Sequence, residues 1–424
     1  MKCNLGLVTN SLMALVPSGG EYHINQVVDR LKKEYDLAYF PTAYALLQAQ
    51  SPEDFNKLKG IADRLEKGGI KVAQAALDFL EKGEPITERD WKKSRVTLQL
   101  FYDLAGRYRD QASSLEFLYA PNFITPEVAL MGKPYGVLIQ GYFDPLYVNP
   151  LSYAIKRVKM GERSFPSALV SSAGVWLYWR RVVGLLKKNR PEFVASVNSV
   201  GISPPLRGLA RETRALKFGF AVDLASLPPP HEKKDYLVYI GRLVPEKGLY
   251  ELPKVVSILK AERREVELRV AGNLSEKFRA KFQKALEARG VVGNVKLLGY
   301  INGKEKWDLL SGAKALIYPS HNDLNALSIL EAVAAGTPAV TYDLPGIRNR
   351  YSTVSAVIRV KEFDVVGMAK EAGRFLDMSS QEIKEFMNRE GVKALLSSHG
   401  SWSTVYAEEV SLIEAYVKRH GCAQ

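Results

Sequence analysis

From residue 236 onward, short apolar runs alternate with longer segments whose apolar residues follow helical spacing. The apolar runs are YLVYIG (236–241), VELRVAG (266–272), VKLLGY (295–300), ALIYPS (315–320) and TPAVTYD (337–343). The helical segments lie between them, over 250–262, 275–289, 304–311 and 326–335. This alternation predicts a doubly wound α/β domain with a parallel sheet, in which ligands bind at the carboxyl ends of the strands.

The first half of the chain has a similar but less regular pattern. LGLV (5–8) predicts a strand, and a turn-like stretch ending in Gly19 and Gly20 leads into a helical pattern. Further strands are predicted over 36–40, 115–120, 135–140 and 192–200. Residues from about 50 to 112 have helical spacing, which predicts a helical insertion in an open α/β domain. We interpret this insertion as structural cover, with a lid or an acceptor platform as alternatives.

The chain changes character at Leu227, which is followed by three prolines and then by charged residues. Proline continues neither a helix nor a central strand, and 424 residues exceed what one hydrophobic core normally organises. We therefore predict a domain boundary here, with a first domain over 1–225 and a second over 226–400.

Composition narrows the classes of partner. The chain is 46% hydrophobic and 25% charged, as in ordinary globular proteins, and its formal net charge of +13 favours anionic partners. Nucleic acid is not predicted, because the basic residues are scattered and no zinc-finger or RNA-recognition signature occurs. The two cysteines, Cys3 and Cys422, support neither a disulfide framework nor a metal site. With an N-terminal stretch too weakly apolar for a secretory signal, this predicts a cytoplasmic protein.

The first loop with candidate chemistry is GRLVPEKG (241–248), which directly follows a predicted strand. The planar guanidinium of Arg242 can bridge two phosphate oxygens, and the ammonium of Lys247 adds a point charge. Together they suit a diphosphate that gains negative charge as it leaves. The alternative is a solvated loop with two surface cations.

The second loop follows the strand at 315–320 and contains Asp323, and Glu331 follows in the next helix after seven intervening residues. Backbone N–H groups at the start of that helix, from Asn325, Ala326 and Leu327, form an anion site. Carboxylates repel phosphates, so we expect both acids to accept hydrogen bonds from hydroxyls. In the alternative interpretation, Asp323 caps the helix and Glu331 faces solvent.

Four features together resemble the retaining glycosyltransferases of family 4. They are GRLVPEKG (241–248), LLGY (297–300), the acid-seven-Glu segment ending in LEAVAAGTP (330–338), and Ser401-Trp402 before a terminal helix. The resemblance covers most of residues 236–420. It implies the GT-B fold, in which two Rossmann-like domains face each other across a cleft and the second domain binds a nucleotide-sugar donor. It also implies domain closure about 218–234 and a terminal helix over 401–424 that crosses back to the first domain.

The resemblance also implies roles for individual residues. Arg242 and Lys247 would hold the donor diphosphate, Asp323 would contact the transferred sugar, and Glu331 would contact the ribose. Tyr300 would border the donor. Gly19 and Gly20 would bring backbone close to the donor phosphate and the acceptor, although a plain structural turn is the alternative for these glycines.

The sequence departs from the family pattern in two places that concern the sugar. The family usually has a histidine after the strand that corresponds to YGVLIQ (135–140), but Gln140 stands here. An amide can hydrogen-bond a sugar or acceptor hydroxyl but cannot act as a base, so a binding role is expected for Gln140. The first acid is Asp323 where the family more commonly has glutamate.

The implied reaction moves a sugar with retention from a nucleotide-diphosphate sugar to a hydroxyl of a glycan, a lipid-linked sugar or a small molecule. No metal or other cofactor is expected, because the spacing of the five histidines offers no metal-ligand pair. We interpret His321 as a polar loop residue. The alternatives are an epimerase or hydrolase of nucleotide sugars on the same fold, and a catalytically silent ligand-binding protein.

An uncharged stretch with two tryptophans, residues 164–179, is followed by basic residues up to Arg190. It is too short to span a bilayer. Its composition suits peripheral contact with the inner face of a membrane through 164–190, as expected for a lipid-linked acceptor. The alternative is a buried helix whose cationic end faces water.

Overall fold

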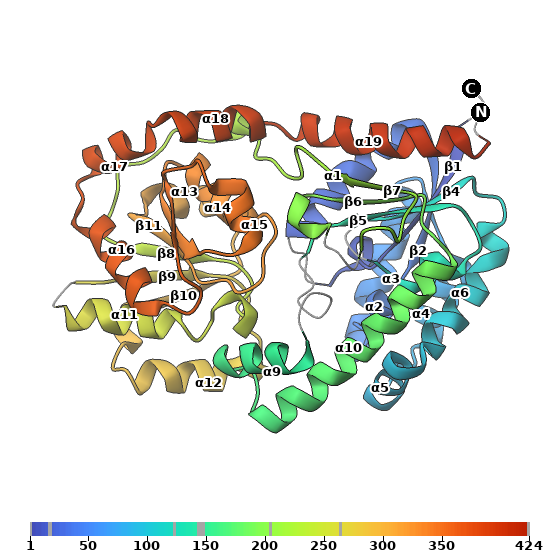
Figure 1. Cartoon of the computed structure of the whole chain (residues 1–424), viewed down its shortest axis with the longest axis horizontal. Helices are drawn as coiled ribbons and strands as arrows, with labels where there is room; N and C mark the ends of the chain where they lie inside the picture. The colour runs from blue at the N-terminus through green and yellow to red at the C-terminus, as the bar shows by residue number, and fades with distance from the viewer. Residues whose placement is uncertain are drawn as a thin grey trace. The chain divides into compact units, whose positions relative to one another are not determined.

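The computed structural model describes residues 2–15, 19–121, 124–141, 149–202, 206–262 and 265–421. The chain forms two compact units. The N-terminal unit comprises Met1–Tyr153, Leu169–Gly219 and Ser403–Gln424, and the C-terminal unit comprises Ala154–Ala168 and Phe220–Trp402. Each unit contains one parallel sheet with helices around it (Figure 1).

The sheet of the N-terminal unit has seven strands in the order β3-β2-β1-β4-β5-β6-β7. The strands are β1 (Cys3–Thr9), β2 (Tyr35–Pro41), β3 (Ile70–Val72), β4 (Phe117–Ala120), β5 (Tyr135–Ile139), β6 (Phe193–Ser196) and β7 (Glu212–Ala215). Every residue of β4, β5 and β6 is buried, which explains why these strands read as continuous apolar runs. β7 lies at the edge with all of its residues exposed.

Within the described ranges, the helices that begin in this half of the chain are α1 (Gly19–Glu34), α2 (Ala43–Leu46), α3 (Pro52–Lys67), α4 (Gln74–Lys82), α5 (Glu88–Thr97), α6 (Gln99–Ala112), α7 (Pro126–Leu130), α9 (Pro150–Lys159) and α10 (Phe165–Lys188). We expected the region from about 50 to 112 to be helical throughout. It also contains β3, which pairs with β2 at the edge of the sheet. A strand of three residues is too short to show a period in the sequence.

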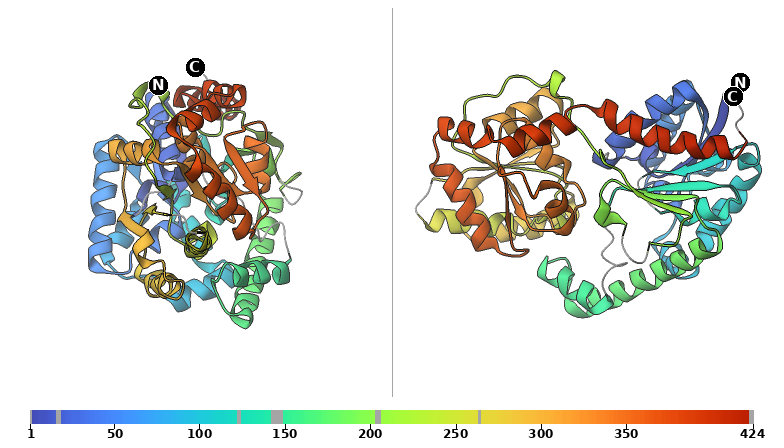
Figure 2. Two further views of the ribbon diagram at one scale, coloured as in Figure 1. Left: turned by 90° about the vertical axis from the view of Figure 1, so that its left-hand side faces the viewer. Right: turned by 45° about the horizontal axis from the view of Figure 1, so that its top comes forward.

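The helix α19 (Trp402–Arg419) packs on the N-terminal unit, where Figure 2 shows it alongside the sheet and its helices. Glu409 of α19 is almost fully buried and pairs with His23 of α1 at 2.6 Å. The hydroxyl of Tyr119 in β4 donates to the same carboxylate. A buried carboxylate needs such partners, so these contacts fix the position of the helix on this unit.

Cys3 is disulfide-bonded, so the expectation that the cysteines form no disulfide was wrong. Two cysteines separated by nearly the whole sequence give no indication of their distance in the fold. Cys422 lies outside the described residues. Within the described ranges, no helix is long and apolar enough to cross a membrane.

The sheet of the C-terminal unit has six strands in the order β10-β9-β8-β11-β12-β13. The strands are β8 (Leu237–Ile240), β9 (Leu268–Ala271), β10 (Val295–Gly299), β11 (Ala315–Tyr318), β12 (Ala339–Tyr342) and β13 (Val357–Val360). Each strand-like run from 236 to 343 thus contains one strand. The order reverses between β8 and β11, which are paired in parallel, so the switch point of the sheet lies between them.

The C-terminal unit includes most of α9, and its helices after Phe220 alternate with its strands and then continue beyond the last one. They are α11 (Leu252–Ala261), α12 (Glu276–Glu287), α13 (Gly303–Gly312), α14 (Leu327–Ala334), α15 (Pro345–Tyr351), α16 (Val365–Asp377), α17 (Ser380–Met387) and α18 (Glu390–His399).

Glu127 of α7 is a fully buried carboxyl group in the N-terminal unit. Its Oε1 accepts a hydrogen bond of 2.7 Å from the backbone N–H of Ala43, and its Oε2 has no partner in the described part of the chain. Burial raises the pKa of Glu127 to about 7, well above the 4.5 of an exposed glutamate. The native state therefore binds this proton more tightly than the unfolded state.

We expect the free energy of unfolding to fall as the pH rises from about 4.5 through about 7, because the native state must then ionise a buried group. Glu127→Gln keeps an acceptor for Ala43 and removes the ionisation. The difference in melting temperature between this variant and wild type should increase in favour of the variant from pH 5 to pH 8. The corresponding difference in the free energy of unfolding should change by about 2–3 kcal/mol at most. Parallel melting curves across this range would contradict the prediction.

Gly248, in the loop after β8, packs against Pro319 in the loop after β11. Its φ is +79°, and a Cβ at this position would lie 2.3 Å from the carbonyl oxygen of Pro319. Gly290 has a similar φ of +63°, but a Cβ there would contact nothing within 4 Å. The two glycines therefore separate backbone strain from steric overlap.

Gly290→Ala should cost about 1–2 kcal/mol of stability from its left-handed backbone alone. Gly248→Ala should cost more, because the backbone at Pro319 must also move. Thermal unfolding of both variants tests this. Equal losses would mean that the two loops are not as closely packed as the structure indicates.

Candidate functional site

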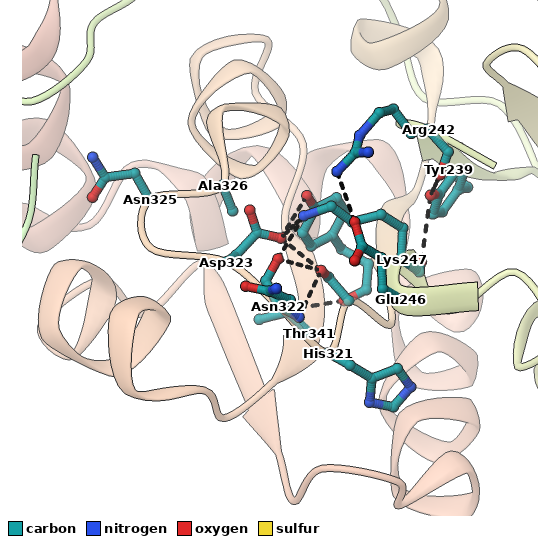
Figure 3. A network of polar contacts seen from close by, with 12 residues as sticks. Tyr239, Arg242, Glu246, Lys247, His321, Asn322, Asp323, Asn325, Ala326 and Thr341 are labelled. Atoms are coloured by element: carbon teal, nitrogen blue, oxygen red, sulfur yellow. Dashed lines mark hydrogen bonds and ion pairs between the residues drawn. The ribbon is translucent and has the colours of Figure 1, made fainter. Parts of the chain in front are cut away.

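The candidate site lies at the switch point, where β8 and β11 end side by side. Arg242 and Lys247 follow β8, and Lys247 ends a short 3₁₀ helix, Pro245–Lys247. Asp323 follows β11 in the loop that leads to α14. Figure 3 shows Lys247 and Asp323 pointing toward each other across the two loops.

Lys247 and Asp323 form an ion pair that is mostly buried. The Lys247 Nζ lies 2.7 Å from Asp323 Oδ2 and also donates to the carbonyl oxygen of Asn322 at 2.6 Å. The side chains are 11% and 14% exposed. The interpretation of Lys247 as a surface cation is therefore wrong.

Asp323 receives all of its hydrogen bonds on one oxygen. Besides Lys247, the hydroxyls of Tyr318 and Ser320 donate to Oδ2 at 2.9 and 2.6 Å. Oδ1 has no hydrogen bond in the described part of the chain. The N-cap of α14 is Ala326, without a side-chain hydrogen bond, so the alternative role of Asp323 as a helix cap is also wrong.

Arg242 is more exposed than Lys247, at 56% of its side chain, and pairs with Glu246 at 2.8 Å. Partial desolvation opposes its charge, but the carboxylates of Glu246 and Asp323 outweigh it and raise the pKa of Arg242. The hydroxyl of Tyr239 donates to the carbonyl oxygen of Arg242 at 2.8 Å, which ties the loop to β8. The guanidinium thus stays charged beside the ion pair of Lys247.

Glu331 of α14 is 12% exposed, so it does not face solvent as the alternative required. Its Oε1 accepts from the Nζ of Lys306 at 2.6 Å. Lys306 lies on α13 and was missed in the sequence, because no motif connects it with a partner on another helix. Only the fold brings Lys306 next to Glu331.

The start of α14 is shaped by Ala326, whose φ is +48°. Asn325 is 8% exposed, and in Figure 3 its side chain points away from Asp323. The hydroxyl of Tyr351 donates to the carbonyl oxygen of Asn325 at 2.8 Å. Leu327 is the first residue of the helix, and Tyr300, which follows β10, is 61% exposed.

Other predicted site residues lie in the N-terminal unit. Gly19 and Gly20 are the first residues of α1, and the residues 16–18 before them lie outside the described ranges. Gln140 directly follows β5, at the carboxyl end of the sheet. Its Nε2 is buried and has no hydrogen-bond partner among the described residues, which suits a donor to a ligand.

His321 is not the polar loop residue that we expected, because its side chain is fully buried and its ring points away from Asp323 (Figure 3). Its Nδ1 lies 3.0 Å from Glu362, its Nε2 lies 3.5 Å from Glu251, and its ring stacks on Phe363. Burial opposes protonation, but the two glutamates outweigh it and raise the pKa of His321. The described residues contain no group of three or more His, Cys, Asp or Glu side chains that could hold a metal ion.

Comparison with known proteins places the family signal in the C-terminal unit. Residues 227–351 match the model of the family "Glycosyl transferases group 1". A glycogen synthase of Mycobacterium tuberculosis is 27% identical over 173 residues, which are 40% of each chain. A 2-deoxystreptamine glucosyltransferase of Streptomyces kanamyceticus is 26% identical over 35% of this chain and 38% of its own. The match thus spans about 40% of the length of these relatives.

Solved structures resemble the chain over nearly its whole length. Sucrose-phosphate synthase from Thermosynechococcus elongatus has a TM-score of 0.68 at 13% identity, and the match covers 99% of this chain and 100% of the synthase chain. HepE of Anabaena, in complex with UDP and glucose, has a TM-score of 0.65 at 14% identity, with 98% and 100% covered. The chain has the GT-B fold, and its residues 227–351, which carry Arg242, Lys247, Asp323 and Glu331, match the group 1 glycosyl transferases.

Proposed function

We propose that this protein is a retaining glycosyltransferase that moves a hexose from a nucleotide-diphosphate sugar to an acceptor hydroxyl. One observation carries the proposal: Arg242, Lys247 and Asp323 come together from two loops at the switch point of the sheet. Cations and a carboxylate at this place suit a ligand with both phosphates and hydroxyls. The match of the same segment to group 1 glycosyl transferases supports it.

Arg242 and Lys247 bind the diphosphate in this proposal. Each cation is paired with a carboxylate in the structure, so donor binding requires the phosphates to replace or join those partners. The guanidinium of Arg242 is the more exposed of the two and is free to reach two phosphate oxygens at once. Gly19 and Gly20 contribute backbone from the N-terminal unit.

The carboxylates bind hydroxyls. Asp323 offers Oδ1 to a hydroxyl of the sugar, while Glu331 accepts from the ribose. Asn325, Ala326, Leu327 and Tyr300 line the donor. Gln140 donates its buried Nε2 to a hydroxyl of the sugar or the acceptor, which would satisfy an amide nitrogen that has no partner in the described part of the chain.

In the reaction, the acceptor oxygen approaches the face of the sugar from which the diphosphate departs. The bond from the acceptor oxygen to the anomeric carbon forms, the bond from that carbon to the phosphate oxygen breaks, and the acceptor proton passes to the departing phosphate. Arg242 and Lys247 stabilise the charge that develops on the diphosphate. Because the protein supplies these cations itself, we propose that no metal ion or other cofactor is required.

The acceptor is a glycan, a lipid-linked sugar or a small molecule. The names of the relatives, a glycogen synthase and a 2-deoxystreptamine glucosyltransferase, support a polysaccharide or a polyhydroxylated small molecule. We further propose that the protein works in the cytoplasm, at or near the inner face of a membrane, although the disulfide at Cys3 is a feature that is rare in reducing compartments.

The donor site is tested by calorimetric titration with UDP, GDP and ADP and with their hexose conjugates. One nucleotide should bind wild type selectively, and Arg242→Ala should weaken it about 10- to 100-fold through the loss of charge-assisted hydrogen bonds. Arg279→Ala is the matched control, because Arg279 is similarly exposed and paired within α12. Binding that is equal in the two variants would contradict the assignment of Arg242.

The activity is tested by NMR of the products with and without candidate acceptors. Transfer with the anomeric configuration of the donor supports the proposal. Donor consumption without an acceptor would indicate an epimerase or hydrolase, and binding without any turnover would indicate a silent binding protein. No binding of any nucleotide by wild type would refute the proposed function altogether.

Membrane contact is proposed through α10, whose exposed face is apolar in its first half and basic in its second. Val170 is 76% exposed and Leu177 is 47% exposed. The guanidinium of Arg180 lies 4.6 Å from the ring of Trp176. Further along the helix, exposed cations continue at Arg181, Lys187 and Lys188. Apolar and basic side chains on one exposed face suit the surface of an anionic bilayer.

Arg180→Glu combined with Arg181→Glu should weaken binding to phosphatidylserine-containing vesicles at low salt by about tenfold or more, since each cation near such a surface contributes about 1 kcal/mol. Arg64→Glu combined with Lys67→Glu, on exposed positions of α3, is the control and should change binding less. Co-sedimentation measures both. Failure of wild type to bind these vesicles would rule out the contact.

A further inference from the structure

The ion pair between Lys306 and Glu331 has a geometry similar to that of the pair between Lys247 and Asp323. In both, a lysine from another element lies within 2.7 Å of one carboxylate oxygen. In both, the second oxygen has no hydrogen bond among the described residues. The side chains of Lys306 and Glu331 are 22% and 12% exposed, so each pair is largely removed from water.

An ion pair to one oxygen restricts the rotation of a carboxylate, so the direction of its other oxygen is restricted as well. Glu331 has no other side-chain partner in the described part of the chain, and Lys306 alone restrains it. Without Lys306 the carboxylate would be free to change rotamer or to draw in water. The loss of a partner from a partly buried ion pair also leaves the remaining charge poorly compensated.

We propose that Lys306 is a positioning residue of the donor site: it fixes Glu331 so that Oε2 accepts a hydrogen bond from a ribose hydroxyl of a nucleoside diphosphate. This inference rests on the proposed function. Lys306 itself does not touch the nucleotide, and it acts only through Glu331. Its contribution to affinity therefore depends on the presence of the hydroxyl that Glu331 binds.

A purely structural role of Lys306 would affect nucleotide affinity in a different way from a positioning role. The same ion pair joins α13 to α14, and breaking it could loosen both helices. Such loosening would lower the affinity for every nucleotide alike, whether or not the ribose hydroxyl is present. A ligand that lacks the hydroxyl therefore separates the two roles.

The experiment titrates wild type, Lys306→Met, Lys306→Gln and Lys306→Arg with UDP, 2′-deoxy-UDP and 3′-deoxy-UDP, or with the corresponding GDP or ADP series if that base binds. Lys306→Met and Lys306→Gln should weaken the ribonucleotide about tenfold and leave unchanged the affinity for one of the two deoxy analogues. Lys306→Arg should restore part of the discrimination. Lys304→Met is the matched control, since Lys304 is 79% exposed on the same helix and should have no effect.

The outcomes distinguish the two proposals. If wild type binds a nucleotide but the Lys306 variants lose the same factor with all three ligands, the positioning role is overturned and the proposed function stands. If the Lys306 variants bind like wild type, the positioning role is overturned as well. If wild type binds no nucleotide, the proposed function fails and this inference fails with it.

Discussion

The ion pair of Lys247 and Asp323 is the interaction on which the site depends, because it joins the loops that follow two neighbouring strands. Its geometry needs the close approach of Gly248 to Pro319, which only a residue without a Cβ permits. A mostly buried ion pair adds little net stability compared with apolar side chains of similar size, yet losing one partner is costly. Such a pair is therefore better explained by the placement of charge than by stability.

Charge in the site is balanced before any ligand arrives. Arg242, Lys247 and Lys306 each lie within hydrogen-bonding distance of a carboxylate. Under the proposed function, a diphosphate would meet cations whose fields are partly cancelled, and it would have to replace or join their carboxylate partners. Arg242 is the least buried of the three, and its pair with Glu246 is the one most screened by solvent. We infer that this exposed pair exchanges first, while the buried pairs keep the two carboxylates in place.

The sequence predicted the C-terminal sheet well because its central strands are buried on both faces and read as short apolar runs. It failed for β13 at the edge of that sheet, for β3, which has three residues, and for β7, whose four residues are all exposed. Loops at the carboxyl ends of parallel strands meet at one edge of the sheet, so it could be predicted that Arg242, Lys247 and Asp323 lie close together. The position of Lys306 could not be predicted, since its partner lies 25 residues away on another helix and the pair has no sequence period.

His321 explains why the loop after β11 holds its shape. Ser320 and Asp323 face the site, whereas His321 between them points inward to Glu251 and Glu362. Its backbone N–H donates to the carbonyl oxygen of Glu246 at 2.9 Å, which is a second tie to the loop after β8. The buried ring lies between the carboxylates of Glu362 and Glu251, which raise its pKa, so rotation of this loop would separate these groups and leave the carboxylates without the ring in a poorly solvated interior. The position of Asp323 is thus set as much by this buried cluster behind the loop as by Lys247 in front of it.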